Sequence, residues 1–224
     1  MKWDYEVDSV DIKNRFHQTP FLFYLGFNQR VSSSMINVFL EEYRSDPLIR
    51  DGVSNGVFHW AVRNTAISRG YGLDALRFLC EAVEDHSRAF EPNAKGESIF
   101  HVYFGRNTVF SEDVVRLFLD WKLDLHGVDM RGNTCLHAAC GNVAVRDKML
   151  LFLMSETDGE GRSVVMQIGV KNRDDCTPMD LYRDCRSEEA YSAFVRQIAQ
   201  HHKLSQFVKL DRRTNSLFLS TDTF

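Results

Sequence analysis

Five short segments of the sequence nearly repeat one another, and this repetition limits the folds that the chain can adopt. Residues 18–22, 97–101, 133–137 and 176–180 are close copies, and residues 55–59 form a weaker one. An Asn or Asp stands eight residues before the last residue of every copy; these residues are Asn14, Asp51, Asn93, Asp129 and Asn172. They lie outside the similar segments and therefore support the repetition independently. Self-similarity at a spacing of roughly 20–50 residues is typical of stacked-repeat proteins.

Each copy precedes two helical patterns. The hydroxyl side chains that can cap the first helix belong to Thr19, Ser98, Thr134 and Thr177. Pro20 and Pro178 then fall at the first helical position, where no N–H is needed. Apolar residues at i, i+3, i+4 spacing predict second helices at 35–40, 73–79, 114–119, 149–153 and 191–198. From the last residue of each copy to the last large aliphatic residue of its second helix, the offsets are 18, 20, 18, 16 and 18. This constancy predicts one helix-turn-helix unit used five times.

Residues 129–139 resemble the ankyrin repeat family. Their sequence, DMRGNTCLHAA, matches the first eleven positions of the family pattern D-x-x-G-x-T-P-L-H-x-A-A except at Cys135, where the family has Pro. The other copies depart further, with Tyr103 in an Ala place and with Leu22 and Asp180 in the His place. The resemblance covers about residues 9 to 203. It implies an all-α ankyrin-repeat solenoid of about five helix-turn-helix repeats.

The predicted domain spans residues 9–204, with a short N-terminal extension at 1–8. Its repeats are expected at about 14–50, 51–92, 93–128, 129–171 and 172–204. The last residues of successive copies are 37, 42, 36 and 43 residues apart, longer than the 33 typical of ankyrin repeats, so the connections are extended. The largest insertion, 155–170, either forms a loop on the binding face or packs on itself.

Residues 205–224 are expected to form a C-terminal cap or tail. Two apolar strings at 207–210 and 216–219 flank a polar segment, which predicts a hairpin. Solenoids need their terminal apolar faces covered, so a cap is one interpretation. The alternative is a short linear segment that docks into a partner, and the same choice arises for the aromatic N-terminal stretch.

The pattern Cys135-x-His137-x-x-Cys140 suggests zinc, but a structural zinc site needs about four ligands. No second pair completes the set. We interpret His137 as a hydrogen-bond donor or acceptor to neighbouring backbone and both cysteines as small buried side chains. His59, His101 and His137 occupy equivalent places in stacked helices about 8–10 Å apart, so they cannot converge on one substrate. We therefore predict no catalytic residue, no cofactor, no metal and no enzyme activity.

Composition agrees with a binding protein. The chain has 224 residues, 44% of them hydrophobic, and 17 are Phe. Phe21, Phe58 and Phe100 are expected to fill space between repeats. A net charge of −4 with no long run of one sign argues against a dedicated nucleic-acid binder. Five cysteines and no apparent secretory signal or membrane span predict an intracellular, cytoplasmic or nuclear location.

The family resemblance implies protein–protein recognition through the concave surface made by the loop tips and the first helices. We expect a protein partner, no nucleic acid and no membrane, and a monomer when unbound. Projecting the family's variable positions, and adding Trp60 as an aromatic anchor that could instead be core, gives the expected contact residues. They are Arg15, Phe16, Gln18, Asn55, Trp60, Arg63, Asn64, Lys95, Glu97, Arg106, Asn107, Met130, Arg131, Asn133, Asn142, Arg173 and Asp174.

The role of such a module is left open between an adaptor, an inhibitor and an assembly chaperone. Two alternatives are a non-catalytic regulatory subunit of an enzyme complex and a pathogen effector that acts on a host protein.

Overall fold

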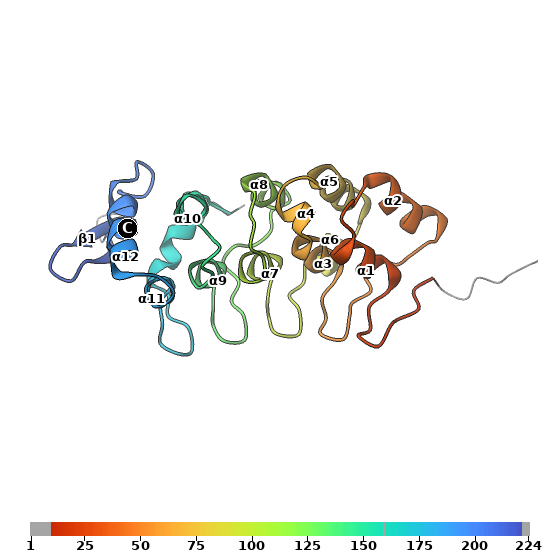
Figure 1. The fold of residues 1–224 in the computed structure, drawn as a ribbon, viewed down its shortest axis with the longest axis horizontal. Helices are drawn as coiled ribbons and strands as arrows, with labels where there is room; N and C mark the ends of the chain where they lie inside the picture. Colours follow the sequence, from red (N-terminus) through yellow and green to blue (C-terminus); the bar gives the residue numbers. More distant parts are fainter. Residues whose placement is uncertain (1–9, 159, 221–224) are drawn as a thin grey trace, which may run out of the picture.

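The structure is a computed structural model that describes residues 10–158 and 160–220, and the described chain is mostly helical. Its helices lie in two rows along an elongated molecule (Figure 1). The inner row contains α1 (Pro20–Phe27), α3 (Val57–Arg63), α7 (Ile99–Arg106), α9 (Cys135–Cys140) and α11 (Pro178–Asp184). Each of these helices contacts the next one in the row.

The outer row follows the predicted second helices. It contains α2 (Ser33–Asn37), which continues as the π-helical turn η1 (Val38–Glu42), and then α5 (Leu73–Ala82), α8 (Glu112–Asp120), α10 (Asp147–Met154) and α12 (Glu188–Gln200). The remaining short helices are α4 (Thr65–Ser68), α6 (His86–Ala89) and the 3₁₀ helix η2 (Val164–Gly169). The predicted N-terminal extension at 1–8 lies outside the described residues.

The predicted helix starts of the inner row are confirmed. Helices α1 and α11 begin at Pro20 and Pro178, and the hydroxyls of Thr19 and Thr177 accept backbone N–H groups of the first turn at 3.3 Å and 3.2 Å. These caps satisfy donors that have no partner within the helix. At the first helical position the backbone N–H has no partner within the helix, so proline, which lacks an N–H, fits there without loss of a hydrogen bond. The local sequence therefore determines where both helices begin.

Phenylalanine fills the space between neighbouring helix pairs, as predicted. Phe21, Phe58 and Phe100 are each no more than 1% exposed. Phe58 and Phe100 both place their rings edge-on to Phe118 of α8, with ring centroids 6.2 Å and 6.0 Å apart. Burying each ring contributes roughly 1.5–3 kcal/mol, so these contacts hold the two rows together.

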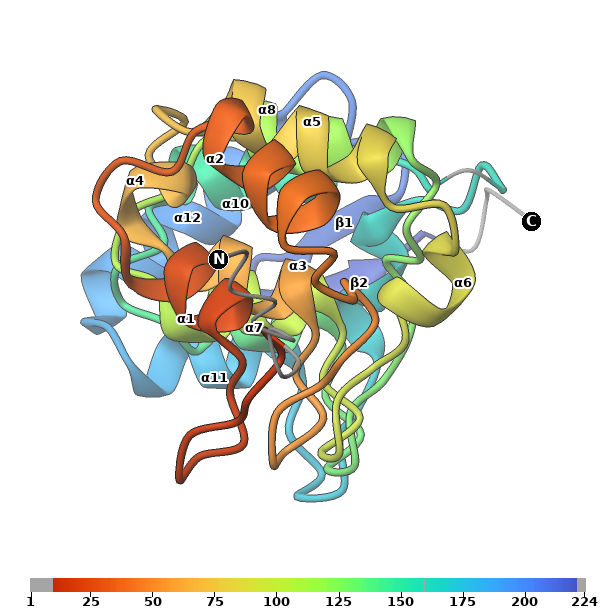
Figure 2. The same ribbon diagram turned by 90° about the vertical axis from the view of Figure 1, so that its right-hand side faces the viewer.

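The loops before the inner helices share one conformation, and we call residues 14–18, 51–55, 93–97, 129–133 and 172–176 the finger turns. They project side by side from the inner row (Figures 1 and 2). In each turn, the Oδ1 atom of the first residue accepts the backbone N–H groups two and four residues later, at 2.8–3.1 Å. The periodic Asn and Asp residues of the sequence are therefore the residues that close these turns.

The fourth position of each finger turn has a positive φ, between 59° and 74°. Gly96 and Gly132 occupy two of these positions, which suits glycine because it has no Cβ. A Cβ at Gly96 would lie 3.0 Å from the backbone nitrogen of Met130 in the next finger turn. This close approach allows the turns to stack.

Backbone hydrogen bonds join successive finger turns. The N–H groups of Gly52, Ala94, Met130 and Arg173 donate to the carbonyl oxygens of Phe16, Val53, Lys95 and Arg131, at 3.3, 3.0, 2.9 and 2.9 Å. Each bond uses the second residue of one turn and the third residue of the turn before it. The bonds therefore fix the register of the whole row.

The insertion at 155–170 packs into the molecule. Its first part closes on itself through a bridge between Thr157 and Ser163. Its second part is η2, which contacts α9, α10 and α11, and whose Val164 and Val165 are fully buried. Of the two interpretations, the structure favours the packed one.

The predicted C-terminal hairpin is present. Strands β1 (Val208–Asp211) and β2 (Ser216–Leu219) pair antiparallel, with Val208 opposite Leu219. Both strands contact α12, and β2 also contacts η2. Val208 is buried, so the hairpin covers the apolar side of the last helix pair as a cap would.

We expect the Asp129→Ala variant to lose about 2–3 kcal/mol of unfolding free energy, because three hydrogen bonds to its carboxylate close the fourth finger turn. Urea unfolding followed by circular dichroism measures this loss. The matched variant Asp129→Asn keeps an Oδ1 acceptor, as Asn93 and Asn172 do in their own turns, and should lose less than half as much. Equal losses in the two variants would contradict the proposed role of the acceptor.

Candidate binding surface

A hollow of about 600 Å³ lies where the finger turns meet the inner helices. Gly105, Ala138, Gly141 and Leu181 contribute its apolar lining, and Lys95, Arg106 and Arg131 contribute positive charge. We keep the name concave surface for this hollow together with the exposed finger-turn residues and the C-terminal end of α3.

The three motif histidines join neighbouring units. Nε2 of His59, His101 and His137 lies 3.1, 2.7 and 3.0 Å from the carbonyl oxygen of the last residue of the next finger turn. Their Nδ1 atoms accept the backbone N–H that precedes each helix, at 3.4, 3.2 and 3.1 Å. Nδ1 is therefore the acceptor and Nε2–H the donor, and the predicted bond between His137 and neighbouring backbone is confirmed.

Burial keeps these imidazoles neutral. It lowers the pKa of His59 to about 4, despite the Glu97 carbonyl, which favours the charged form. Burial also lowers the pKa of His101 and of His137 below the ordinary value. With both ring nitrogens engaged, these side chains serve the scaffold.

Cys135 and Cys140 are buried, as predicted. Burial raises the pKa of the Cys135 thiol to about 12, and its Sγ donates to the Leu125 carbonyl at 3.2 Å. Burial raises the pKa of Cys140 as well. Both thiols therefore stay protonated at neutral pH.

Three asparagines that we expected at the partner contact bond to backbone carbonyls instead. The amides of Asn64, Asn107 and Asn142 each donate to the C-terminal end of the preceding inner helix, with bonds of 2.7–2.8 Å. Asn64 and Asn107 are also buried. These amides satisfy carbonyls that have no partner within the helix. We correct their assignment from contact residues to links between neighbouring helices.

Several expected contact residues in the finger turns also belong to the scaffold. Gln18 and Asn55 are buried. The Asn55 amide donates to Asp51 at 3.0 Å, and its oxygen accepts from Asn93 at 2.9 Å. Asn133 makes the same two bonds between the fourth and fifth finger turns: its amide donates to Asp129, and its oxygen accepts from Asn172. The Asn55 and Asn133 amides are therefore engaged within the row of turns. We correct the buried Gln18 and Asn55 to scaffold residues, whereas Asn133 also lines the hollow of the concave surface.

Trp60 is a core residue, which settles the choice left open by its sequence. It is 5% exposed, and its indole N–H donates to Asp51 at 3.0 Å. Its ring lies 5.4 Å from that of Phe27, and a Cβ at Gly26 would clash with it at 2.5 Å. The guanidinium group of Arg63 lies over the Trp60 ring, with its Cζ atom 4.5 Å from the ring centroid.

The remaining expected contact residues are solvent-accessible. The exposed ones are Arg15, Phe16, Arg63, Lys95, Arg106, Met130, Arg131, Arg173 and Asp174, and Glu97 is half-buried. Arg106 pairs with Glu97 at 3.0 Å, and Arg131 pairs with Asp174 at 2.8 Å. The second pair joins the fourth and fifth finger turns. The structure therefore places most of the predicted charged residues on one surface.

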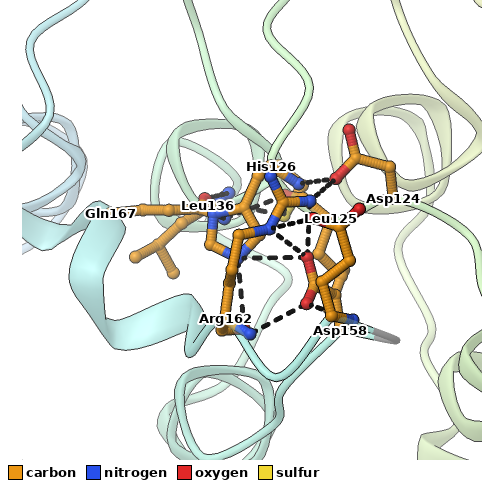
Figure 3. Close-up of polar contacts among 9 residues, drawn as sticks. Asp124, Leu125, His126, Leu136, Asp158, Arg162 and Gln167 are labelled. Atoms are coloured by element: carbon orange, nitrogen blue, oxygen red, sulfur yellow. Dashed lines mark hydrogen bonds and ion pairs between the residues drawn. The ribbon is translucent and has the colours of Figure 1, made fainter.

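The sequence did not reveal the polar network that holds the insertion (Figure 3). Asp158 accepts from Arg162 and is buried; burial opposes its ionisation, but the Arg162 hydrogen bonds outweigh it and lower the pKa of Asp158. Arg162 also bonds to Asp124 at 2.9 Å. Gln167 donates to the Leu125 carbonyl at 2.8 Å. The spacing of Asp158 and Arg162 was the only local signal, because the other partners lie about 40 residues away in sequence.

A second missed feature is a partly exposed apolar patch on α1. Phe23 and Phe27 are each 51% exposed, with ring centroids 4.7 Å apart. Ile12, which is 68% exposed, lies beside them in a shallow hollow. The all-round apolar sequence of α1 was the available signal.

No protein-family model matches the chain, and a search of curated proteins finds no match either. Among the described residues, no helix has the length and apolar character that crossing a membrane requires.

We expect the pH dependence of stability to report on His59. Its pKa is lowered in the folded state, so the unfolded chain binds more protons below pH 6.5, and stability falls as the pH falls toward about 4. His59→Gln removes this proton. The stability advantage of the wild type over His59→Gln should shrink by about 2.5 kcal/mol between about pH 7.5 and about pH 4.5.

Urea unfolding at both pH values measures this difference. The control is Arg77→Gln at an exposed position, which should follow the wild type at both pH values. A constant difference between wild type and His59→Gln across the range would show that the imidazole is not held neutral.

Proposed function

We propose that the chain is a divergent ankyrin-type solenoid that binds a partner protein through its concave surface and carries out no chemistry of its own. The observation that carries this proposal is the shared hydrogen-bonding pattern of the finger turns. The same acceptor closes each turn, and a backbone bond joins each turn to the next. Such a row presents exposed side chains on a rigid support, which lowers the entropy cost of binding.

The distribution of polar groups also favours a binding role. The motif histidines have both ring nitrogens engaged, and Cys135 and Cys140 are buried with raised pKa values. The groups best suited to catalysis therefore support the scaffold. An adaptor, inhibitor or assembly chaperone that works inside the cell fits these properties.

A second candidate is a regulatory subunit that stays assembled with an enzyme. The half-exposed Phe23 and Phe27 favour it, because apolar patches on a surface often mark a permanent interface. In that case the apolar patch on α1 would be a second contact, separate from the concave surface.

Site-specific photo-crosslinking tests the concave surface. A photoreactive benzoylphenylalanine replaces Phe16 or Met130 on this surface, and Tyr71 or Phe218 elsewhere; all four side chains are exposed and apolar. We expect the first two positions to give the same discrete protein adduct in an extract of the organism that encodes the chain. The two control positions should give none. Adducts at Tyr71 and Phe218 alone would contradict the proposal. In a fifth variant the photoreactive residue replaces Phe23, and an adduct there would favour the subunit alternative.

A further inference from the structure

The concave surface carries an excess of positive charge, whereas the chain as a whole carries an excess of negative charge. The whole sequence carries a net charge of −4. The cations of this surface are Arg15, Arg63, Lys95, Arg106, Arg131 and Arg173. Its carboxylates are Asp51, Glu97, Asp129, Asp174 and Asp175, the last of which pairs with Lys171 at 3.0 Å. The excess of positive charge is therefore local, on the surface where we propose that the partner binds.

The carboxylates on this surface are occupied by the scaffold. Asp51 accepts four hydrogen bonds, two from backbone N–H groups and two from the side chains of Asn55 and Trp60. Asp129 accepts three, all from its own finger turn. Asp174 pairs with Arg131. The oxygen atoms of these carboxylates already accept hydrogen bonds or ion pairs from other groups of the protein, so they offer little to a cationic ligand.

Glu97 is likewise engaged on two sides. It accepts from the Asn93 amide at 2.8 Å and from Arg106 at 3.0 Å. Burial opposes its ionisation, but these two hydrogen bonds outweigh that effect and lower its pKa. Glu97 therefore stays ionised and bound at neutral pH.

Several cations of this surface, by contrast, have no anionic partner. Arg15, Arg63, Lys95 and Arg173 form no ion pair with any residue in 10–158 or 160–220. Arg63 lies flat on Trp60. Its pKa is lowered by burial and then by the positive charge of Arg106 in the next unit. Arg106 lines the hollow, and its guanidinium group and that of Arg63 in the unit before repel each other. An incoming anion would relieve this repulsion.

We propose that the concave surface binds an extended acidic segment of the partner protein, whose carboxylates meet Arg63, Lys95 and Arg106 beside Met130. This inference rests on the proposed function and names the chemistry of its partner. Guanidinium groups bind carboxylates through paired hydrogen bonds, which suits both arginines. Met130 is 61% exposed and adds an adaptable apolar contact.

The spacing of the units fits a polypeptide. Packed neighbouring helices lie about 8–10 Å apart, and an extended chain rises about 3.3 Å per residue. Acidic residues about three positions apart would therefore reach equivalent cations in successive units. The small side chains of Gly105 and Ala138 leave room for a backbone along the hollow.

Single-stranded nucleic acid is the rival polyanion, and the hollow suits it less. Such binders use exposed aromatic rings on which bases stack. No Phe, Tyr or Trp is among the described residues that line the hollow. Trp60 is 5% exposed and is covered by Arg63, and the exposed Phe16 lies in the first finger turn, outside the lining of the hollow.

Fluorescence polarisation of labelled probes with the full chain tests the proposal. The acidic probe is a peptide of about 16 residues with Glu at every third position, and the matched neutral probe has Gln at those positions. The third probe is oligo-dT of about 16 nucleotides. We expect the Glu peptide alone to bind, and its binding to weaken as salt rises from about 50 mM to about 300 mM.

The triple variant Arg63→Gln, Lys95→Gln, Arg106→Gln should weaken binding of the Glu peptide about tenfold. The control variant Arg77→Gln, Arg196→Gln, Arg212→Gln removes three exposed cations outside the concave surface and should weaken it less than twofold. Circular dichroism verifies folding. If the triple variant does not fold, Lys95→Gln alone, at an exposed position, should still weaken binding about twofold.

Three outcomes overturn the acidic-segment proposal. They are no binding of the Glu peptide, equal binding of the Gln peptide, and equal effects of the two triple variants. Oligo-dT that binds as tightly, with the same dependence on Arg63 and Arg106, would replace it with a nucleic-acid ligand. If the photo-crosslinks at Phe16 and Met130 persist while the Glu peptide fails, only the acidic character of the partner is wrong. Loss of both results removes the proposed function itself.

Discussion

The backbone hydrogen bond from each finger turn to the turn before it is the contact on which the rest of the structure depends. The inner helices are only six to eight residues long, and each contacts its neighbours in the row rather than distant parts of the chain. Apolar packing between such short helices does not by itself fix their register. A bond between defined residues of successive turns does, and the histidine bond to the same turn adds a second fixed point.

The two ends of the row explain why the sequence pattern weakens there. In the last unit of the described residues Asp180 replaces the histidine and accepts from the N–H and hydroxyl groups of Thr177. In the first unit Leu22 replaces the histidine and is buried. There the contact to the next unit is aromatic instead, with Trp60 packed against Phe27 and Gly26. The sequence pattern therefore changes in these two units because the groups that their side chains contact differ from those in the inner units.

The sequence predicted the parts of the structure that depend on local chemistry. The helix starts at Pro20 and Pro178, the second helices and the hairpin follow from caps, periodicity and turn residues. It did not reveal which polar side chains are consumed internally. Asn64 and Asn55 look like surface residues in sequence, but their partners lie 39 and 38 residues away. A family pattern places a residue along the chain but does not say where its side chain points. Which of these residues are buried could therefore be learned only from the structure.

The use of carboxylates inside the scaffold has a consequence for the surface. Asp51 and Asp129 close their finger turns, so removing their charge would also remove hydrogen bonds that hold the row together. Lys95 and Arg173, by contrast, stand at turn tips and form no ion pair within the described chain. Substitutions at these two cations can therefore change the charge of the concave surface at little cost to stability. A scaffold built in this way separates the residues that maintain the fold from those that select the partner.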